Sequence, residues 1–423
     1  MHVEPGAAAT ASGRAFGAFR HRDFRLFWGG SVISNVGAWM QQVAQGWLVY
    51  ELTGSAFLVG LNGLFHSIPF ILVSLYAGTV VDRVDRRKLL LWVEGFNTLV
   101  VVIVGALVAT GNIQLWHIYL SSAAVSLGGG FESPTRQALL PHLIPREDLM
   151  TAVSLNSIVR KGAQIVGPAL GGLFVAAFGV AGAYFIHSMA SGVLMWCIVQ
   201  MRATNPARTT KLSAVEAIRE GLHYVRGDAL IATLLLMEAA MSTFGSYQAM
   251  MVIFAKDVFG MGPQGLGLLQ SAAGVGSVVG SFTLATIGDV RHKGKLLMVS
   301  GVGYGTALIV FAYCPWFLAA LAVLPIVGAM DIIFGATRTT ITQLMVPREM
   351  LGRVMSLQGI AMRGLGNFGT FQTGTVASFV GVHSAVAIGA MACILATLAA
   401  GWLVPAVRGF TGVGQENVPR GSI

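Results

Sequence analysis

The sequence predicts an all-α membrane protein in which twelve transmembrane helices form two pseudo-symmetric six-helix bundles. Three observations lead to this fold class: few charged residues, a series of apolar runs long enough to span a membrane, and a repeat that relates the two halves of the chain. Of the 423 residues, 55% are hydrophobic and only 11% are charged, whereas soluble domains carry about 25% charged residues. So few charged side chains cannot cover the surface of a soluble chain of this length.

The apolar runs set the domain organisation, because a helix needs about 20 mainly apolar residues to cross the hydrocarbon core. The first half has six runs, at 25–50, 56–80, 89–109, 115–136, 151–177 and 180–201. The second half has six more, at 229–254, 264–287, 296–313, 316–345, 352–379 and 383–407. The predicted parts are therefore a tail, a bundle, a linker, a second bundle and a second tail, at 1–24, 25–201, 202–228, 229–407 and 408–423.

The basic residues lie on one side of this predicted topology. With twelve spans and a cytoplasmic start, only Lys256 of the 27 Lys and Arg residues falls in an external loop. Basic residues are retained on the cytoplasmic side during insertion, so the asymmetry predicts a multi-pass protein of the cell membrane with both termini in the cytoplasm. The net charge of +9 then faces anionic lipid headgroups, and we expect no nucleic acid partner.

A repeat relates the two halves. Pro145-Arg146-Glu147 recurs as Pro347-Arg348-Glu349, a shift of 202 residues, and earlier in each half the shift is 207. Further matches are Thr135-Arg136 with Thr337-Arg338, Gly60-Leu61 with Gly267-Leu268, Asp82 with Asp289, and Lys88 with Lys295. Because six spans separate the copies, both halves have the same orientation, as in parallel-repeat transporters.

The linker between the halves contains a candidate amphipathic helix. Its apolar stripe consists of Val215, Ile218, Leu222 and Val225. Such a helix is expected to lie at the membrane surface, here on the cytoplasmic side.

The loop after the second span carries a charged motif, Gly78-Thr-Val-Val-Asp82-Arg83-Val-Asp-Arg86-Arg87-Lys88. This segment resembles the G-x-x-x-D-R-x-x-R-[RK] signature of the major facilitator superfamily and matches it at every defined position. An ordinary basic loop is the alternative. An acidic group at a helix boundary can bind helix N-termini and nearby arginines, and the resemblance implies a gate on the cytoplasmic side. The second half keeps Asp289 and Lys295 but has Ala285 where the glycine would stand.

Two further stretches narrow the resemblance. They are Asn35-Val-Gly-Ala-Trp39-Met-Gln41-Gln42-Val-Ala-Gln45-Gly-Trp47-Leu-Val-Tyr50-Glu-Leu-Thr53-Gly54-Ser55-Ala and Phe131-Glu132-Ser-Pro134-Thr-Arg136-Gln137-Ala-Leu-Leu-Pro141. Both are similar to the exporter-like branch typified by siderophore and macrolide efflux carriers. The resemblance covers nearly the whole chain and implies secondary transport by two bundles that rock about a shared cavity.

The fifth span contains Gly162-Ala-Gln-Ile-Val-Gly167-Pro168-Ala-Leu-Gly171-Gly172. This segment resembles the G-P-x-x-G-G motif of antiporters, although Ala163 stands where a further glycine is expected. Glycine and proline also bend helices and admit close neighbours, so a purely structural kink is the alternative.

Ionisable residues inside predicted spans are candidates for proton coupling, because they are costly in a membrane unless they face a cavity or a partner. They are Glu132, Glu238 and Asp331, together with Arg136 one turn from Glu132. A carboxylate that meets two environments alternately can take up and release a proton. A structural Glu132–Arg136 pair is the alternative.

Polar side chains on the first span are candidates for lining a cavity: Asn35, Gln41, Gln42 and Gln45, with Trp39 as an apolar wall. Gln41 and Gln45 share one face, and Asn35 and Gln42 share another. Hydrogen bonds to neighbouring helices are the alternative for each amide, and core packing is the alternative for Trp39.

The leading functional hypothesis is a proton-coupled exporter of an amphiphilic small molecule such as a drug or siderophore. We expect it to work as a monomer, without a metal or cofactor. A uniporter, importer or lipid-moving carrier on the same fold is the first alternative, and a non-transporting receptor or scaffold is the second. The sequence has no P-loop, no His-Glu-x-x-His and no Gly-x-Ser-x-Gly, so enzymatic activity is not expected.

Overall fold

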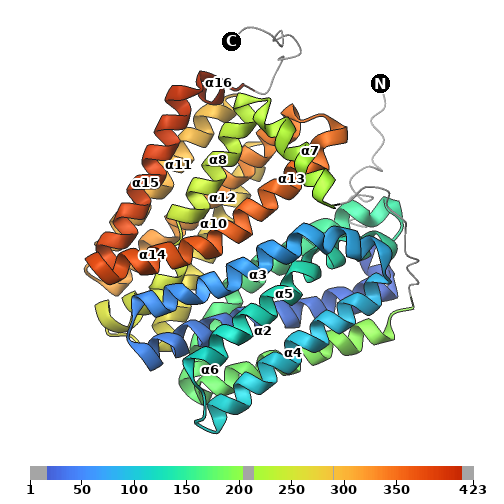
Figure 1. Ribbon diagram of the computed structural model, residues 1–423, viewed down its shortest axis with the longest axis vertical. Helices are drawn as coiled ribbons and strands as arrows, with labels where there is room; N and C mark the ends of the chain where they lie inside the picture. The colour runs from blue at the N-terminus through green and yellow to red at the C-terminus, as the bar shows by residue number, and fades with distance from the viewer. Residues whose placement is uncertain (1–16, 203–213, 289, 412–423) are drawn as a thin grey trace, which may run out of the picture. The chain divides into compact units, whose positions relative to one another are not determined.

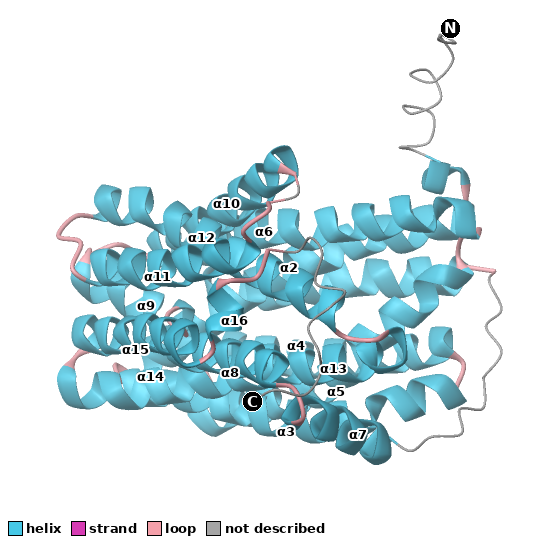
Figure 2. Cartoon of the chain, turned by 90° about the horizontal axis from the view of Figure 1, so that it is seen from above, coloured by secondary structure: helices cyan, strands magenta, loops and turns pink. Residues whose placement is uncertain are grey.

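The computed structural model describes residues 17–202, 214–288 and 290–411. Within these ranges every regular element is a helix and no strand occurs (Figure 2), which confirms the predicted all-α class. The expectation for Asp289 falls outside the described residues, as does that for the side chain of Asp82.

The helices of the first half follow the predicted runs. After a short 3-10 turn, η1 (Gly17–Arg20), they are α2 (Arg22–Thr53), α3 (Ala56–Arg83), α4 (Arg86–Ala109), α5 (Leu115–Leu139) and α6 (Leu149–Gln200). Two 3-10 turns, η2 (Leu140–His142) and η3 (Arg146–Asp148), connect α5 to α6.

One long helical element, α6, contains both the fifth and the sixth predicted spans. The two parts meet at Gly179, whose φ of 71° interrupts the helical backbone. In the second half Gly381 stands at the corresponding repeat position with φ 81° and separates α14 from α15. Residues with a Cβ rarely adopt positive φ, so glycine permits the same reversal in both halves.

The second half follows a linker helix, α7 (Ala214–Arg226). Its elements are α8 (Ala229–Phe244), η4 (Gln248–Met250), α9 (Met251–Ile253), the π-turn η5 (Phe254–Val258), α10 (Pro263–Ile287), α11 (Lys293–Ala312), α12 (Phe317–Met345), α13 (Arg348–Ile360), the π-turn η6 (Ala361–Leu365), α14 (Gly366–Val380), α15 (Val382–Leu403) and α16 (Pro405–Arg408).

Eight helical stretches in the described chain are long and apolar enough to cross a membrane: Ala56–Gly78, Arg86–Ala109, Arg146–Gln200, Ala229–Val258, Pro263–Ile287, Lys293–Ala312, Phe317–Met345 and Val382–Leu403. The first predicted span, in α2, and the fourth, in α5, are long enough but contain the amides and the charged residues described above. Large apolar side chains such as Trp92, Leu318 and Phe379 are exposed, as expected for surfaces that contact lipid.

The described chain forms two compact units. The first unit contains the residues up to Gly54, then Phe65–Val215 and Val252–Ser271; the second contains Ser55–Leu64, Glu216–Met251 and the residues from Ala272 onward. Within the first unit α2 packs along α6, and α4 packs against α5 and α6 (Figure 1). Within the second unit α11 packs against α12 and α15, and α8 packs against α14 and α15. Residues 55–64 and 252–271 thus each lie with the unit formed mainly by the other half of the sequence.

Candidate functional site

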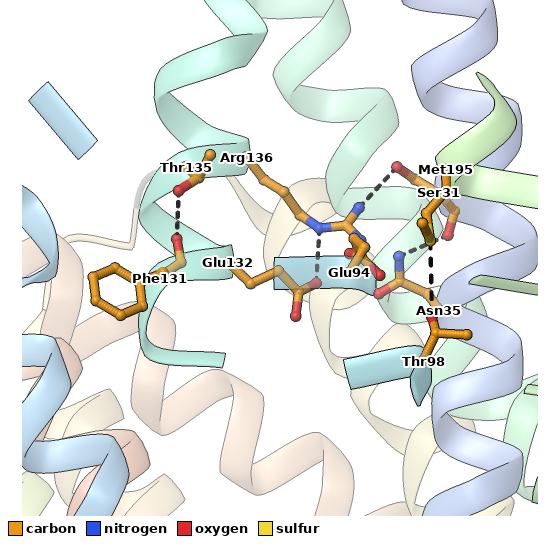
Figure 3. A network of polar contacts seen from close by, with 9 residues as sticks. All are labelled: Ser31, Asn35, Glu94, Thr98, Phe131, Glu132, Thr135, Arg136 and Met195. Atoms are coloured by element: carbon orange, nitrogen blue, oxygen red, sulfur yellow. Dashed lines mark hydrogen bonds and ion pairs between the residues drawn. The ribbon is translucent and has the colours of Figure 1, made fainter. Parts of the chain in front are cut away.

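A partly buried arginine is the centre of a charge cluster in the first unit (Figure 3). Arg136 on α5 donates from Nε to Glu132 Oε1 at 2.8 Å, and from Nη2 to Glu94 Oε1 on α4 at 2.6 Å. Its Nη1 donates to Ser31 Oγ on α2 at 3.1 Å. All three guanidinium nitrogens are therefore used, and the cluster connects three helices.

The two carboxylates of this cluster differ in exposure. The side chain of Glu94 is 6% exposed and that of Arg136 is 15% exposed, whereas that of Glu132 is 33% exposed. With both carboxylates ionised, the three residues carry one more negative than positive charge. Binding one proton makes the cluster neutral, and Glu132 is the more exposed of the two carboxylates.

A second cluster lies in the second unit. Arg338 on α12 is 3% exposed and forms an ion pair with Glu238 on α8, and Ser242 donates to Glu238 at 3.1 Å. Asp331, about two turns before Arg338 on α12, is exposed and interacts electrostatically with both charged groups. This cluster, too, contains two carboxylates and one arginine.

The two clusters occupy corresponding positions of the repeat. Arg136 and Arg338 are related by the shift of 202, while Ser31, which binds Arg136, and Glu238, which binds Arg338, are related by the shift of 207. The arginine position and its contact on the first helix of each half are thus shared. The carboxylates are not, because Glu132 corresponds to buried Phe334.

Sequence reasoning identified part of these clusters. The Glu132–Arg136 pair is present, and Glu238 is buried in an ion pair. Glu94 and the role of Arg338 were missed. Glu94 lies inside the third apolar run, so the criterion that selected the other carboxylates would have selected it as well. The correspondence of Arg338 with Arg136 was visible in the repeat, but its pairing with Glu238, 100 residues away, depends on the fold.

The amides of α2 mostly bond within the helix bundle. Gln41 donates to Gln45 at 2.9 Å, and Gln45 donates to Ser122 on α5 at 2.5 Å. Asn35 donates to the Ser31 carbonyl at 2.7 Å. The shared face of Gln41 and Gln45 therefore includes a bond to a neighbouring helix, while Gln42 is exposed.

The glycines of the fifth-span motif allow close helix approaches. A Cβ on Gly167 would collide with that of Trp39, and a Cβ on Gly171 would lie 2.8 Å from the Met40 Cα, so these two positions face α2. Gly172 faces α10, because its Cβ would lie 3.1 Å from the Gly267 Cα. Pro168 lies between them and is buried. Gly162 has open space around its Cβ position.

The crossing of Gly172 with Gly267 has a counterpart in the second unit. There a Cβ on Gly60 of α3 would lie 2.8 Å from the Gly374 Cα of α14. Gly172 corresponds to Gly374 at the shift of 202, and Gly60 corresponds to Gly267 at the shift of 207. Each crossing therefore joins the two halves of the sequence through the same pair of repeat positions.

The segment that enters the first unit from the second half has further contacts there. Lys256 on the π-turn η5 lies 5.7 Å and 5.5 Å from the ring centroids of Trp47 and Tyr50. The Tyr50 hydroxyl donates to Asp257, and Ser271 Oγ donates to the Ile165 carbonyl at 2.6 Å. Cation–π and hydrogen-bond contacts thus supplement the glycine crossing.

The charged motif after α3 organises the ends of helices within the first unit. Asp85 caps α4 by accepting from the Arg87 N–H at 2.9 Å, a role that sequence reasoning missed. Arg87 donates from Nε to the Ile198 carbonyl at 2.9 Å and from Nη2 to the Val199 carbonyl at 2.7 Å, at the C-terminal end of α6. Arg86 is buried, with Nη1 2.8 Å from His142 Nε2. Arg83 is exposed.

We expect Arg87→Met to lower the free energy of unfolding by about 1 kcal/mol, because a cation that binds terminal helix carbonyls contributes about that much. Denaturant titration of the purified protein in detergent measures the change. Arg83→Met removes the same charge from the same loop and should change stability by less than about 0.5 kcal/mol. Equal effects of the two variants would contradict the capping role of Arg87.

Comparison with known proteins relates this chain to one family and to several efflux proteins. The profile of the family described as transmembrane secretion effector matches residues 13–409. The chain is 23% identical over 393 residues to the enterobactin exporter EntS of Citrobacter koseri, covering 89% of this chain and 92% of that protein. It is 26% identical over 353 residues to the multidrug efflux pump Tap of Mycolicibacterium fortuitum, covering 81% and 86%. It is 21% identical over 370 residues to macrolide efflux protein A of Streptococcus pyogenes, covering 85% and 90%.

Solved structures show the same fold at low identity. A bacterial homolog of the human lysosomal transporter Spinster, in an inward-facing and unoccupied conformation, has a TM-score of 0.71 at 14% identity, covering 92% of this chain and 97% of that one. A D-xylose–proton symporter has a TM-score of 0.70 at 14% identity, covering 92% and 98%.

Proposed function

We propose that this chain, which belongs to the transmembrane secretion effector family of the major facilitator superfamily, exports an amphiphilic small molecule in exchange for protons. Membership of the family makes it a multi-pass membrane transporter and not an enzyme. Relatives named as exporters of enterobactin, macrolides and multiple drugs support the direction of transport. Their names also favour a substrate of the drug or siderophore type.

The proposed architecture has twelve spans in two bundles, 25–201 and 229–407, with both termini in the cytoplasm. The asymmetry of the basic residues supports this orientation, and the Gly179 and Gly381 breaks support the corresponding division of each half. We further propose that the bundles alternate in access by opening and closing the two repeat-related glycine crossings. The cell membrane is the proposed location.

The coupling proposal rests on one observation, the excess carboxylate of the Glu94–Arg136–Glu132 cluster. When a proton binds Glu132, Arg136 remains paired with Glu94 and the cluster becomes neutral. Moving a neutral cluster through the transport cycle avoids the cost of an uncompensated charge in the membrane. In the second cluster the exposed carboxylate is Asp331, at a different repeat position, while Glu238 is paired with Arg338.

The remaining candidate residues receive proposed roles. Gly78, Asp82, Arg83, Arg86, Arg87 and Lys88 form the cytoplasmic gate, with Asp289 and Lys295 as its counterpart. The contacts of Arg86 and Arg87 support part of this role, because they connect the start of α4 to η2 and to the end of α6.

Gln42 and Trp39 are the proposed cavity-lining residues on α2, since Asn35, Gln41 and Gln45 have bonds within the bundle.

Accumulation assays test export directly. Cells that express the protein should accumulate less ethidium and less radiolabelled macrolide than cells without it, and dissipating the proton gradient should remove the difference. Glu132→Gln should remove it as well, whereas Glu51→Gln, at an exposed carboxylate, should not. Higher accumulation in expressing cells would favour an importer. Unchanged efflux after the gradient collapses would contradict proton coupling.

A further inference from the structure

A cavity lies between the linker helix α7 and α13 in the second unit, where Figure 1 shows these two helices side by side. Its volume is about 740 Å³. It is lined by Arg219, Glu220, Leu222, His223, Tyr224, Arg226, Met350 and Arg353. None of these residues takes part in the charge clusters or in the glycine crossings.

The local sequence explains why the cavity forms. α7 packs through Val225, which is buried with Ile231, Val346 and Val354. Gly221 allows α7 to approach α13, because its Cβ would lie 3.2 Å from that of Arg353. Of the predicted apolar stripe, Val225 therefore packs in the core of the second unit. The side chains of Val215 and Ile218 lie outside the described residues. The polar face of α7 is left to form one wall of the cavity.

The charges on the cavity wall favour an anion. Arg219, Arg226 and Arg353 are cationic, and the imidazole of His223 adds a hydrogen-bonding group to the wall. The one acidic lining residue, Glu220, forms an ion pair with Arg353 at 2.6 Å. Three arginines against one glutamate leave an excess of two positive charges. Arginine suits phosphate in particular, because its planar fork binds two oxygens at once.

The apolar part of the wall and its position favour a lipid over a soluble anion. Leu222 is 38% exposed beside the arginines, and Met350 and Tyr224 add apolar surface. α8 begins at Ala229, directly after α7, so the cavity lies near the end of an apolar helix. In the proposed topology this end faces the cytoplasm, where the lipid headgroup layer contains anionic lipids.

We propose that this cavity binds the phosphate of an anionic phospholipid, with Arg219 and Arg226 as the phosphate-binding residues and Leu222 beside the acyl chains. Glu220 limits the affinity by holding Arg353. The lipid thereby anchors the linker helix to the membrane surface next to α8.

Titration of the delipidated full-length protein in neutral detergent tests the site, with transport playing no part. The probes are dioctanoyl phosphatidylglycerol, dioctanoyl phosphatidylcholine and inorganic phosphate, and binding is followed by microscale thermophoresis. Phosphatidylglycerol should bind saturably and at least about tenfold more tightly than phosphatidylcholine. The double variant R219Q/R226Q should weaken that binding about 30-fold, as expected for two basic residues near an anionic lipid. Glu220→Gln should strengthen it.

The matched control is R291Q/R408Q, which removes two exposed arginines of the same unit away from the cavity and should leave the affinity unchanged. Equal weakening by both double variants would overturn the site in favour of a diffuse charge effect. Inorganic phosphate binding as tightly as phosphatidylglycerol would overturn the lipid assignment. If R219Q/R226Q does not fold, the result for Glu220→Gln decides: unchanged or weaker binding contradicts the proposal.

Discussion

Replacing Arg136 with methionine is expected to lower the free energy of unfolding by about 3–5 kcal/mol and to abolish export. The substitution leaves Glu94 and Glu132 facing each other without their shared cation, and removing one partner from a buried ion pair costs about that much. Methionine keeps most of the volume and the apolar stem, so loss of packing contributes little. Denaturant titration in detergent measures stability, and the ethidium and macrolide accumulation assay measures export.

Two further variants separate charge from packing. Arg160→Met removes an exposed arginine on α6 and should leave stability within about 0.5 kcal/mol of wild type. The triple variant E94Q/E132Q/R136M contains no buried charge at the cluster and should regain most of the lost stability without regaining export. A triple variant as unstable as Arg136→Met would show that the charge imbalance is not the cause.

Gly267→Trp is expected to stop export while leaving the protein folded. The indole has no room against Gly172, so the crossing must open, and overpacking of this kind costs about 1–3 kcal/mol. If a cost of 3 kcal/mol falls on the conformation with the closed crossing and not on the one with the open crossing, the ratio of their populations changes by about 150-fold. Export should therefore fall to the background level, because the closed crossing becomes too rare for turnover.

The same change at an unconstrained glycine provides the control. Gly192 on α6 has open space around its Cβ position, and Gly192→Trp should export normally. Gly60→Trp, at the repeat-related crossing, should behave like Gly267→Trp. Normal export by Gly267→Trp would show that this crossing does not have to close during the cycle.

The sequence predicts the all-α class and the starts of several helices, because the membrane imposes a simple rule. Each spanning helix must be apolar over a set length, so α4 and α11 begin within three residues of their predicted starts at 89 and 296. The predicted boundary between the fifth and sixth runs, from 177 to 180, coincides with the break at Gly179, where the backbone leaves helical geometry. The positive φ of this glycine and of Gly381 was not predicted, because the composition around them does not change.

The site is only partly predictable, because its contacts depend on packing between helices. Glu132 and Arg136 are four residues apart on one helix, so sequence spacing alone pairs them. Pairing Arg338 with Glu238, and adding Glu94 to the first cluster, requires the positions of three-dimensional neighbours. The Asp85 cap was missed for a different reason, because the signature leaves this position undefined although an acidic residue there can cap α4.

The most direct test of the central claim is a proton measurement on purified protein in liposomes that enclose a pH-sensitive dye. Wild type should move protons against the direction of macrolide flux, and a macrolide gradient should therefore generate a pH change inside the vesicles. Glu132→Gln should still exchange labelled for unlabelled macrolide but should produce no pH change. Proton movement by Glu132→Gln at the wild-type rate, or macrolide flux by wild type without any proton movement, would contradict coupling at the Arg136 cluster.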